Sequence, residues 1–358
     1  MRLLLTAAIA LMCSAPASRA QQAEEPAPRK PPALSPGDTI MFVAPSGLLT
    51  KKLTRTAAAR LEAMGYKVAV PEEVFDKYGY LAGTDEQRAE LLNRALTDPE
   101  IDAVFPARGG YGMTRIVDKL DWPAIISGPP KIVIGFSDIT GLHLALAAKA
   151  NWVTFHSPNP EWGLGSDDGM PEFAANYFWR SLLAEQNTGE DGFAYELAGA
   201  WPADKTPTPM AALRAGVAEG RLIGGNLSLV AALMGTPYMP SFEGRVLFLE
   251  DINEEPYRVD RMLSTLRLAG QLDGLAGVLL GQFTKCDAED GKGLSLAQVF
   301  DDYFGEAPYP VITNFPAGHV PLNAALPMGC RVRVDADNLK VTLLENAVTA
   351  RPADAATE

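Results

Sequence analysis

The sequence has little of the chemistry on which metal and disulfide proteins depend. Its 358 residues include three cysteines and three histidines, and neither an HExxH nor a CxxC motif occurs. We therefore expect no metal ion and no other cofactor. Basic residues are outnumbered, with 31 lysines and arginines against 44 aspartates and glutamates, and the formal net charge is −13. This balance disfavours nucleic acid and anionic membrane surfaces as partners.

The sequence also lacks an apolar run long enough to anchor it in a bilayer. The N-terminus has one positive charge, Arg2, followed by a short apolar run over residues 3–12. Small residues then stand at the cleavage positions of residues 18–20, a pattern typical of a secretory signal peptide. We expect cleavage near Ala20 and an exported, periplasmic protein with no integral membrane segment. The alternative is a cytosolic protein with a chance apolar N-terminus.

Two cysteines remain after cleavage, Cys286 and Cys330. An oxidising compartment would permit a disulfide between them. Their spacing does not show that they lie close together, so two free, buried thiols are the alternative.

The first half of the mature chain has the pattern of an α/β domain. After the signal peptide at 1–20, residues 21–36 are rich in proline and alanine, which predicts a disordered tether. Short apolar runs then alternate with helical periodicity over residues 37–156, which predicts a doubly wound parallel sheet. The expected strands are 39–44, 66–70, 101–105, 131–134 and 152–155, and the expected helices 51–64, 84–96, 113–120 and 138–149. The chemistry of such sheets lies at the carboxyl ends of the strands.

The second half has a different pattern. Residues 157–209 show little periodicity and are predicted to connect two domains. Residues 210–345 are expected to form a mixed α/β domain with a β-rich core, and residues 346–358 a flexible tail. The expected elements of this domain are strands from about 214, at 246–249 and at 276–282, helices after 226 and from 256 to about 268, and a hairpin of 331–334 with 340–344.

Two turns in the first domain are candidates for catalysis. Ser137 stands between an apolar strand and a helix, a turn that exposes a hydroxyl above backbone N–H groups able to stabilise an oxyanion. Ile139 replaces the final glycine of GxSxG, so a plain tight turn is the alternative. The glycine-rich loop at 108–112 follows another strand, and its glycines would let the backbone approach a ligand closely. A structural turn accounts for this loop equally well.

A serine hydrolase would have to recruit its base from three histidines. His143 is on a predicted helix and His156 follows a strand. His319 lies in a predicted loop that has glycine and proline on either side of it. Glu250 closes an apolar strand and is well placed to orient an imidazole. The acidic residues within 251–255 are alternatives, and composition does not choose among them.

Taken together, these segments resemble the LD-carboxypeptidase family of serine peptidases, which also contains microcin C immunity peptidases. They occur in the family's order and cover about residues 37–345. The matching segments are 37–38, 44–46, 108–112, 135–140, 224–227, 249–251, 255–257, 315–319 and 326–329.

The resemblance implies a catalytic triad. Its nucleophile would be Ser137, its general base His319 and its orienting carboxylate Glu250. The oxyanion hole would use the backbone N–H groups of Gly110 and Asp138. Because the nucleophile belongs to the first domain and its partners to the second, the active site would lie between domains.

The resemblance also implies a muropeptide substrate, with cleavage between an L-centre, typically of meso-diaminopimelate, and a terminal D-alanine. The leaving residue carries a carboxylate that a cation should receive. Candidate substrate-binding residues are Arg108, Asn226, Arg258 and Arg261. The rival functions are an immunity-type peptidase that cleaves a peptide–nucleotide toxin and a periplasmic binding protein without turnover. A nucleotide-binding oxidoreductase is disfavoured because its glycine fingerprint is missing. A homodimer is left open.

Overall fold

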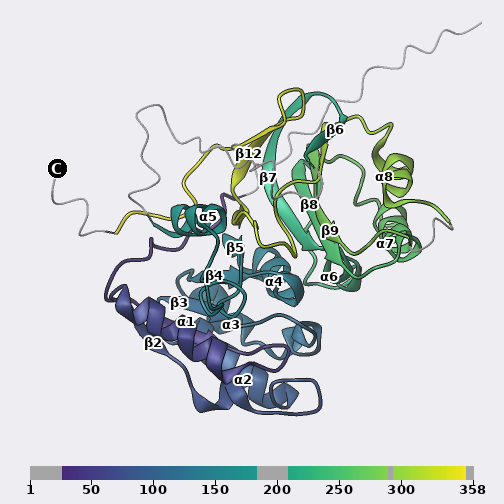
Figure 1. Cartoon of the computed structure of the whole chain (residues 1–358). Helices are drawn as coiled ribbons and strands as arrows, with labels where there is room; N and C mark the ends of the chain where they lie inside the picture. Colours follow the sequence, from purple (N-terminus) through teal and green to yellow (C-terminus); the bar gives the residue numbers. More distant parts are fainter. Residues whose placement is uncertain (1–25, 184–208, 289–292, 352–358) are drawn as a thin grey trace, which may run out of the picture.

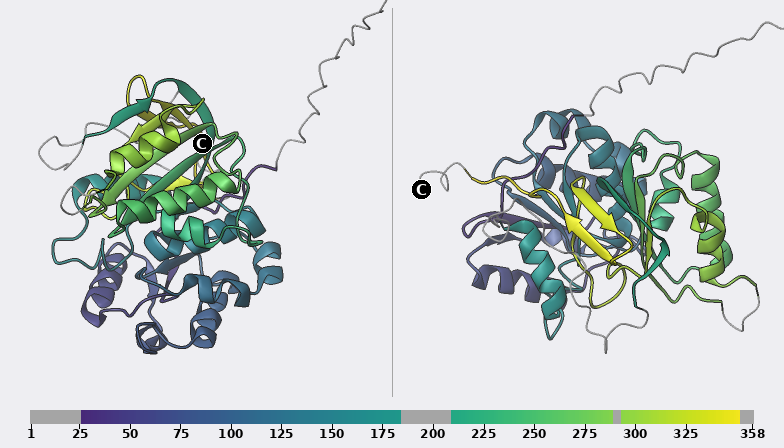
Figure 2. Two further views of the ribbon diagram at one scale, coloured as in Figure 1. Left: turned by 90° about the vertical axis from the view of Figure 1, so that its right-hand side faces the viewer. Right: turned by 90° about the horizontal axis from the view of Figure 1, so that it is seen from above.

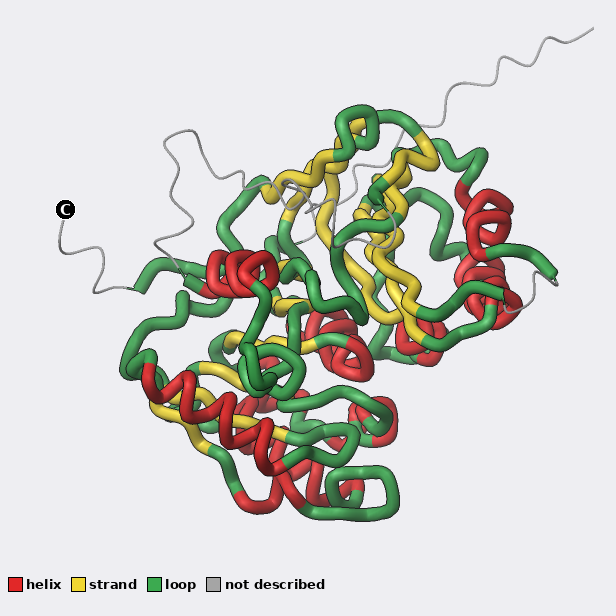
Figure 3. The backbone as a smooth tube through the Cα atoms, in the orientation of Figure 1, coloured by secondary structure: helices red, strands yellow, loops and turns green. Residues whose placement is uncertain are grey.

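The computed structural model describes residues 26–183, 209–288 and 293–351, which form two β-sheets surrounded by helices (Figure 1). The predicted signal peptide lies outside the described residues. No helix in the described ranges is long and apolar enough to span a membrane. Figure 3 shows that loops, rather than further regular elements, make the remaining connections between helices and strands.

The inner strands of the first sheet are short, apolar and buried on both faces, as expected for parallel strands covered by helices, whereas its edge strand at residues 67–69 is partly exposed. Within the described residues its order is β11-β5-β4-β3-β1-β2, and all neighbours except β11 and β5 run parallel. Its strands are β1 (Thr39–Val43), β2 (Lys67–Ala69), β3 (Ala103–Pro106), β4 (Ile132–Gly135), β5 (Thr154–His156) and β11 (Leu326–Met328).

Helices cover this sheet. Thr84 and Gln87 form the predicted capping box at the start of α2, so that boundary is confirmed. The predicted helix at 113–120 is instead two short 3-10 turns. The helical segments are α1 (Lys51–Ala63), η1 (Glu72–Phe75), α2 (Asp85–Thr97), η2 (Met113–Arg115), η3 (Val117–Lys119), α3 (Trp122–Ser127), η4 (Ser137–Ile139), α4 (Thr140–Ala150) and α5 (Glu172–Leu182).

The second sheet is mixed. Among the described residues its order is β13-β12-β7-β8-β9-β10-β6, with β7 to β10 parallel and the outer strands antiparallel. Its strands are β6 (Ala211–Arg214), β7 (Val217–Asn226), β8 (Arg245–Ile252), β9 (Gly277–Thr284), β10 (Val311–Thr313), β12 (Arg331–Asp335) and β13 (Lys340–Leu343). Its helices are α6 (Leu227–Ala232), α7 (Pro256–Leu268) and α8 (Leu296–Phe304). The predicted fold class, a doubly wound domain followed by a mixed α/β domain, is confirmed.

The two halves are joined by a shared apolar core. Phe42 and Phe155 of the first sheet belong to the same buried cluster as Phe248 of the second. Strand β11, which comes from the C-terminal half, pairs antiparallel with β5 of the first sheet. Two further views show the second unit resting on the first across this contact (Figure 2). The shared core and the β11–β5 pairing therefore hold residues from both halves in fixed positions.

Three predicted irregular segments are more ordered than the sequence indicates. The tether prediction is wrong for residues 26–36, where Leu34 is buried and the N–H of Ala33 donates to the carbonyl of Thr349. The prediction of a tail is wrong for 346–351, because Arg351 pairs with Asp38. The connection at 157–209 contains the amphipathic helix α5. Each segment is held by partners far away in sequence, which local composition cannot indicate.

Candidate active site

Ser137 occupies a strained position at the carboxyl end of β4. Its φ is 62°, in the left-handed region that a residue with a Cβ adopts at a cost. Gly135 ends the strand, and Ser137 begins the 3-10 turn that leads into α4. This backbone matches the sharp strand-to-helix turn that the sequence predicts, in which a serine hydroxyl is lifted above a helix N-terminus.

The glycine-rich loop packs directly against this turn. A Cβ on Gly109 would lie 3.0 Å from Cβ and 3.2 Å from Oγ of Ser137, so a side chain there would displace the serine. Gly110 has a φ of 114°, and a Cβ there would lie 3.3 Å from the backbone of Gly47. The glycines thus allow three backbone segments to meet around one hydroxyl. The loop that carries Gly110 and the turn that carries Asp138 lie side by side.

Glu250 and His319 form a buried pair in the second half. His319 Nδ1 lies 2.7 Å from Oε2 of Glu250, whose side chain is fully buried. In the described part of the chain, no hydrogen-bond partner contacts the other carboxylate oxygen. Because Oε2 is paired with Nδ1, the buried carboxylate fixes the orientation of the imidazole ring. Gly318 makes the contact feasible, since a Cβ there would lie 3.0 Å from Glu250 Oε2.

Aromatic side chains bring the two halves together at this point. The ring of Phe136, the residue before Ser137, lies 4.8 Å from the ring of His319, centroid to centroid. Trp162 approaches the same imidazole edge-on at 6.2 Å. A cavity of about 490 Å³ is lined by Phe136 and Trp162 from one half and Val320 from the other. The cavity is therefore bordered by residues adjacent in sequence to the predicted nucleophile and to the predicted base.

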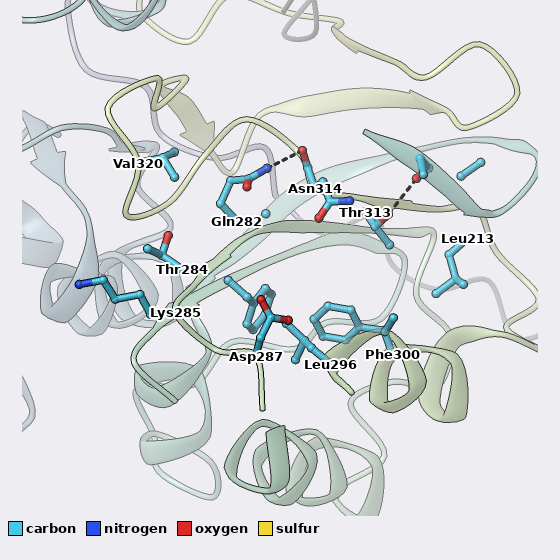
Figure 4. A pocket seen from close by; sticks show the side chains of 15 residues that line it. Leu213, Gln282, Thr284, Lys285, Asp287, Leu296, Phe300, Thr313, Asn314 and Val320 are labelled. Carbon is cyan, nitrogen blue, oxygen red and sulfur yellow. Dashed lines mark hydrogen bonds between the residues drawn. The ribbon is translucent and has the colours of Figure 1, made fainter. Parts of the chain in front are cut away.

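A second cavity, of about 550 Å³, is also lined by Val320, the residue after His319 (Figure 4). Thr284 lines it and donates its hydroxyl to the carbonyl of His319 over 3.0 Å. In Figure 4, Gln282 and Asn314 lie along one side and Phe300 along the other. Gly281 also lines this cavity, and a Cβ there would lie 3.1 Å from Cβ of Glu250, so the cavity lies close to the buried pair.

Two residues that sequence analysis did not select adopt the same strained backbone as Ser137. Asn253 follows β8 with a φ of 58°, and Lys285 follows β9 with a φ of 56°. Both stand just beyond the carboxyl ends of parallel strands, near Glu250. Non-glycine residues in this conformation gather at functional sites. The available signal was a polar residue directly after a predicted strand.

The other two histidines are engaged in the fold. Burial lowers the pKa of His143 to about 4, and His143 Nε2 contacts the carbonyl of Gly135 at 2.9 Å. Burial also lowers the pKa of His156 well below its usual value, and the neighbouring His143 and His319 lower it further. Neither ring is accessible to solvent. Of the three candidates, this arrangement favours His319 as the base.

The predicted substrate-binding residues have different surroundings. Arg108 is exposed on the glycine loop and donates to the carbonyl of Leu48. Asn226 is buried and caps α6, and its amide also donates to Asp251, so its polar atoms serve the fold. Arg258 is exposed and pairs with Glu254, which precedes the start of its helix α7.

Arg261 and Arg258 both lie over the ring of Tyr257 on α7. These two arginines therefore belong to helix α7 of the second half, whereas Arg108 belongs to the glycine loop of the first. Cys286 and Cys330 are free and buried, and burial raises the pKa of each thiol to about 12.

Fold and site together describe a two-sheet α/β protein in which the strained Ser137 turn of one half lies close to the buried Glu250–His319 pair of the other. Within that class, the chain belongs to the LD-carboxypeptidase family. The LD-carboxypeptidase N-terminal domain matches residues 40–157, and the LD-carboxypeptidase C-terminal domain matches residues 219–334.

Similar proteins support this membership. A probable murein peptide carboxypeptidase from Bacillus subtilis is 37% identical, over 89% of this chain and 95% of that protein. The structure of MccF in complex with glutamyl sulfamoyl guanosine superposes with a TM-score of 0.79 at 26% identity, covering 90% of this chain and all of that one. A muramoyltetrapeptide carboxypeptidase from Oxalobacter formigenes gives a TM-score of 0.72 at 29% identity, covering 87% of this chain and all of that one.

Proposed function

We propose that this protein is a serine-dependent LD-carboxypeptidase that releases terminal D-alanine from peptidoglycan tetrapeptides. The observation that carries the proposal is the buried Glu250–His319 pair, joined over 2.7 Å beside the strained turn of Ser137. A nucleophile, a base and an orienting carboxylate are the minimum set for acyl transfer through a covalent intermediate.

The mechanism has two half-reactions, acylation of Ser137 and hydrolysis of the acyl-enzyme, and His319 acts in both. His319 takes the hydroxyl proton as Ser137 Oγ forms a bond to the scissile carbonyl carbon, and Glu250 stabilises the imidazolium. The N–H groups of Gly110 and Asp138 receive the negative charge on the carbonyl oxygen. The C–N bond breaks as His319 returns the proton to the amine of the leaving D-alanine. Water, deprotonated by the same base, then hydrolyses the acyl-enzyme.

Substrate specificity should come from the free carboxylate of the leaving residue. Among the candidate cations we favour Arg108, because it belongs to the loop that packs against Ser137. A tetrapeptide presents its carboxylate one residue beyond the scissile bond. A pentapeptide presents it about 3.5 Å further along an extended chain, where it would miss this partner. The two murein-directed relatives support a muropeptide substrate.

The test is end-product analysis with a tetrapeptide, a pentapeptide and an all-L tetrapeptide, each ending in alanine. Only the tetrapeptide that ends in D-alanine should release its terminal alanine, and the Ser137→Ala enzyme should release none from any of the three. Equal turnover of all three peptides would remove the specificity assignment. Full activity of the Ser137→Ala enzyme would show that Ser137 is not the nucleophile.

A second candidate is cleavage of a peptide–nucleotide. It is favoured by the TM-score of 0.79 to MccF, whose complex holds glutamyl sulfamoyl guanosine. Both functions would use the same triad, so only the substrate separates them. Incubation with an aminoacyl sulfamoyl nucleoside distinguishes them: turnover of that compound, with the tetrapeptide left intact, would favour the second candidate.

Export is part of the proposal and rests on the N-terminal pattern of Arg2 and the apolar run at 3–12. The mature protein should begin near Gln21 and fractionate outside the cytoplasm. Edman sequencing of protein purified from cells tests this directly. An N-terminus at Met1 would contradict it.

A further inference from the structure

Two charged side chains lie buried beneath the Ser137 turn, and the proposed reaction uses neither. Asp138 follows the nucleophile and is 1% exposed. Arg88 comes from α2, and its side chain is fully buried. Burial of a charge is costly unless it is paired and hydrogen-bonded. Their contacts therefore indicate what they hold in place.

Arg88 and Asp138 bind the same two loops at successive residues. Arg88 Nη1 donates to the carbonyl of Pro45 and, over 3.0 Å, to that of Gly112. Asp138 Oδ2 accepts from the hydroxyl of Ser46 at 2.5 Å and from the N–H of Met113 at 2.8 Å. Arg88 thus holds the carbonyls of Pro45 and Gly112. Asp138 holds donors of the residues that follow them, Ser46 and Met113. We call this arrangement of Arg88 and Asp138 the loop clamp.

The loop clamp acts on the backbone that would form the oxyanion hole. The loop after β1 continues to Gly47, whose N–H donates to the carbonyl of Gly109 over 3.1 Å. Gly109 and Gly110 in turn pack against Ser137 and Gly47. Gly112 has a φ of 140°, and a Cβ there would lie 2.7 Å from Arg88 Nη1, so glycine is required for the guanidinium to enter.

We infer that Arg88 and Asp138 are positioning residues that lock the glycine loop onto the Ser137 turn and so preform the oxyanion hole. This inference rests on the proposed serine mechanism. Oxyanion donors stabilise a transition state only when their geometry is fixed before the reaction begins. Loss of the clamp should therefore lower kcat and leave substrate binding nearly unchanged.

The clamp contains a group that titrates in an accessible range. Burial raises the pKa of Asp138 to about 6, although the bonds from Ser46 and Met113 and the charge of Arg88 lower it. Behind Arg88, Asp85 accepts from its other nitrogen at 2.5 Å and also pairs with Arg115. Protonation of Asp138 weakens the acceptor of both loop donors. Activity should then depend on this ionisation as well as on that of the general base.

The experiment compares Asp138→Asn and Ser46→Ala with a matched control, Asp102→Asn. Asp102 also accepts a backbone N–H, that of Thr39, but at the opposite end of the same sheet. The mature enzyme is assayed for D-alanine release from the tetrapeptide between about pH 4.5 and 9, a range in which a raised carboxyl pKa and a histidine pKa both fall. Circular dichroism checks that each variant is folded.

Asp138→Asn should lower kcat about 10–100-fold at pH 8, with little change in KM. Its kcat/KM should fall at low pH with a limiting slope of one, where the unsubstituted enzyme shows a slope of two. Ser46→Ala removes a hydrogen bond that stabilises the ionised carboxylate of Asp138. The pKa of Asp138, seen in the acid limb of the profile, should therefore rise by about one pH unit. Asp102→Asn should match the unsubstituted enzyme.

An unchanged pH profile in Asp138→Asn would overturn the inference, as would a loss confined to KM. If Asp138→Asn fails to fold, Ser46→Ala decides: an acid limb that does not move overturns the clamp. Failure of the proposed function looks different, because the unsubstituted enzyme would then release no D-alanine. An active enzyme that Ser137→Ala inactivates and Asp138→Asn leaves intact rejects the clamp alone.

Discussion

The two halves of the molecule contribute to the site in different ways. The first sheet contributes backbone: Ser137 has a left-handed φ, and Gly109 packs so closely that a methyl group would collide with the serine. The second sheet contributes buried side chains, a carboxylate at Glu250 and an imidazole at His319, joined over 2.7 Å. The first half depends on the close approach of backbone segments. The second half depends on charged and polar side chains that are buried away from water.

This difference predicts two kinds of sensitivity. In the backbone-built half, a single added methyl group should be damaging, because close-packed main chain cannot yield cheaply. In the side-chain half, a change of charge at constant shape should be damaging, because the local environment offers no water to compensate. The comparison is tested by substitutions that change a charge in the second half and by substitutions that add a methyl group in the first.

The largest effects are expected where each half supplies its reacting atom. Ser137→Ala and His319→Ala should each lower kcat by about 10⁴–10⁶-fold, because the covalent step loses its nucleophile or its base. Affinity for the tetrapeptide should change little. Single-turnover D-alanine release and equilibrium binding measure the two quantities. Near-normal turnover in either variant would contradict the assignment.

A charge change in the second half comes next. Glu250→Gln keeps the shape but cannot stabilise the imidazolium, and its amide can hold the wrong tautomer. We expect kcat to fall by about 10³–10⁴-fold. Glu254→Gln, at a partly exposed carboxylate that pairs with Arg258, is the control and should be nearly silent. Equal, small effects of both substitutions would show that Glu250 has no catalytic role.

A methyl group in the first half should cost less. Gly109→Ala places a Cβ 3.0 Å from that of Ser137 and should displace the nucleophile, lowering kcat by about 100-fold. Gly277→Ala in β9 is the matched control, because its nearest neighbour would lie 3.4 Å away, an ordinary contact. If Gly109→Ala keeps full activity, the close packing around Ser137 has no role in catalysis.

The smallest expected effect is on the pH dependence of stability. Asp138 has a folded-state pKa of about 6 against an ordinary value of 3.8, so folding stability declines as pH rises through these values. An asparagine does not titrate, so Asp138→Asn should lack this decline. Between pH 4 and pH 8 the free energy of unfolding of the variant should therefore change relative to that of the unsubstituted enzyme, in favour of the variant, by up to about 3 kcal/mol. Urea unfolding at the two pH values measures this change, and an equal pH dependence in both proteins would refute the expectation.

The elements with strong local signals could be predicted from the sequence. Helix α7 begins at Pro256 and ends at Leu268 as expected, and the capping box of α2 gives its start. Helix α8 was not predicted, although Ser295 and Gln298 form a capping box that could have revealed it. Strand β11 had no such signal, because three residues that include a proline become a strand only by pairing with β5.

The candidate site divides in the same way. Ser137, Glu250 and His319 could be selected because each stands at a strand end or in a distinctive loop, and their order resembles one family. Arg88 could not be selected, because an arginine in a predicted amphipathic helix is usually solvent-exposed. Its burial depends on loops from distant parts of the chain that close over it, and no local pattern encodes that contact.

The central claim is that the two halves form one catalytic unit, and a double-mutant cycle tests it most directly. D-alanine release from the tetrapeptide is measured for Ser137→Ala, His319→Ala and the double variant under single-turnover conditions. If the serine and the histidine act as a unit, the double variant should be no slower than the slower single variant. Losses that multiply would mean that the two residues act independently, and would contradict the account.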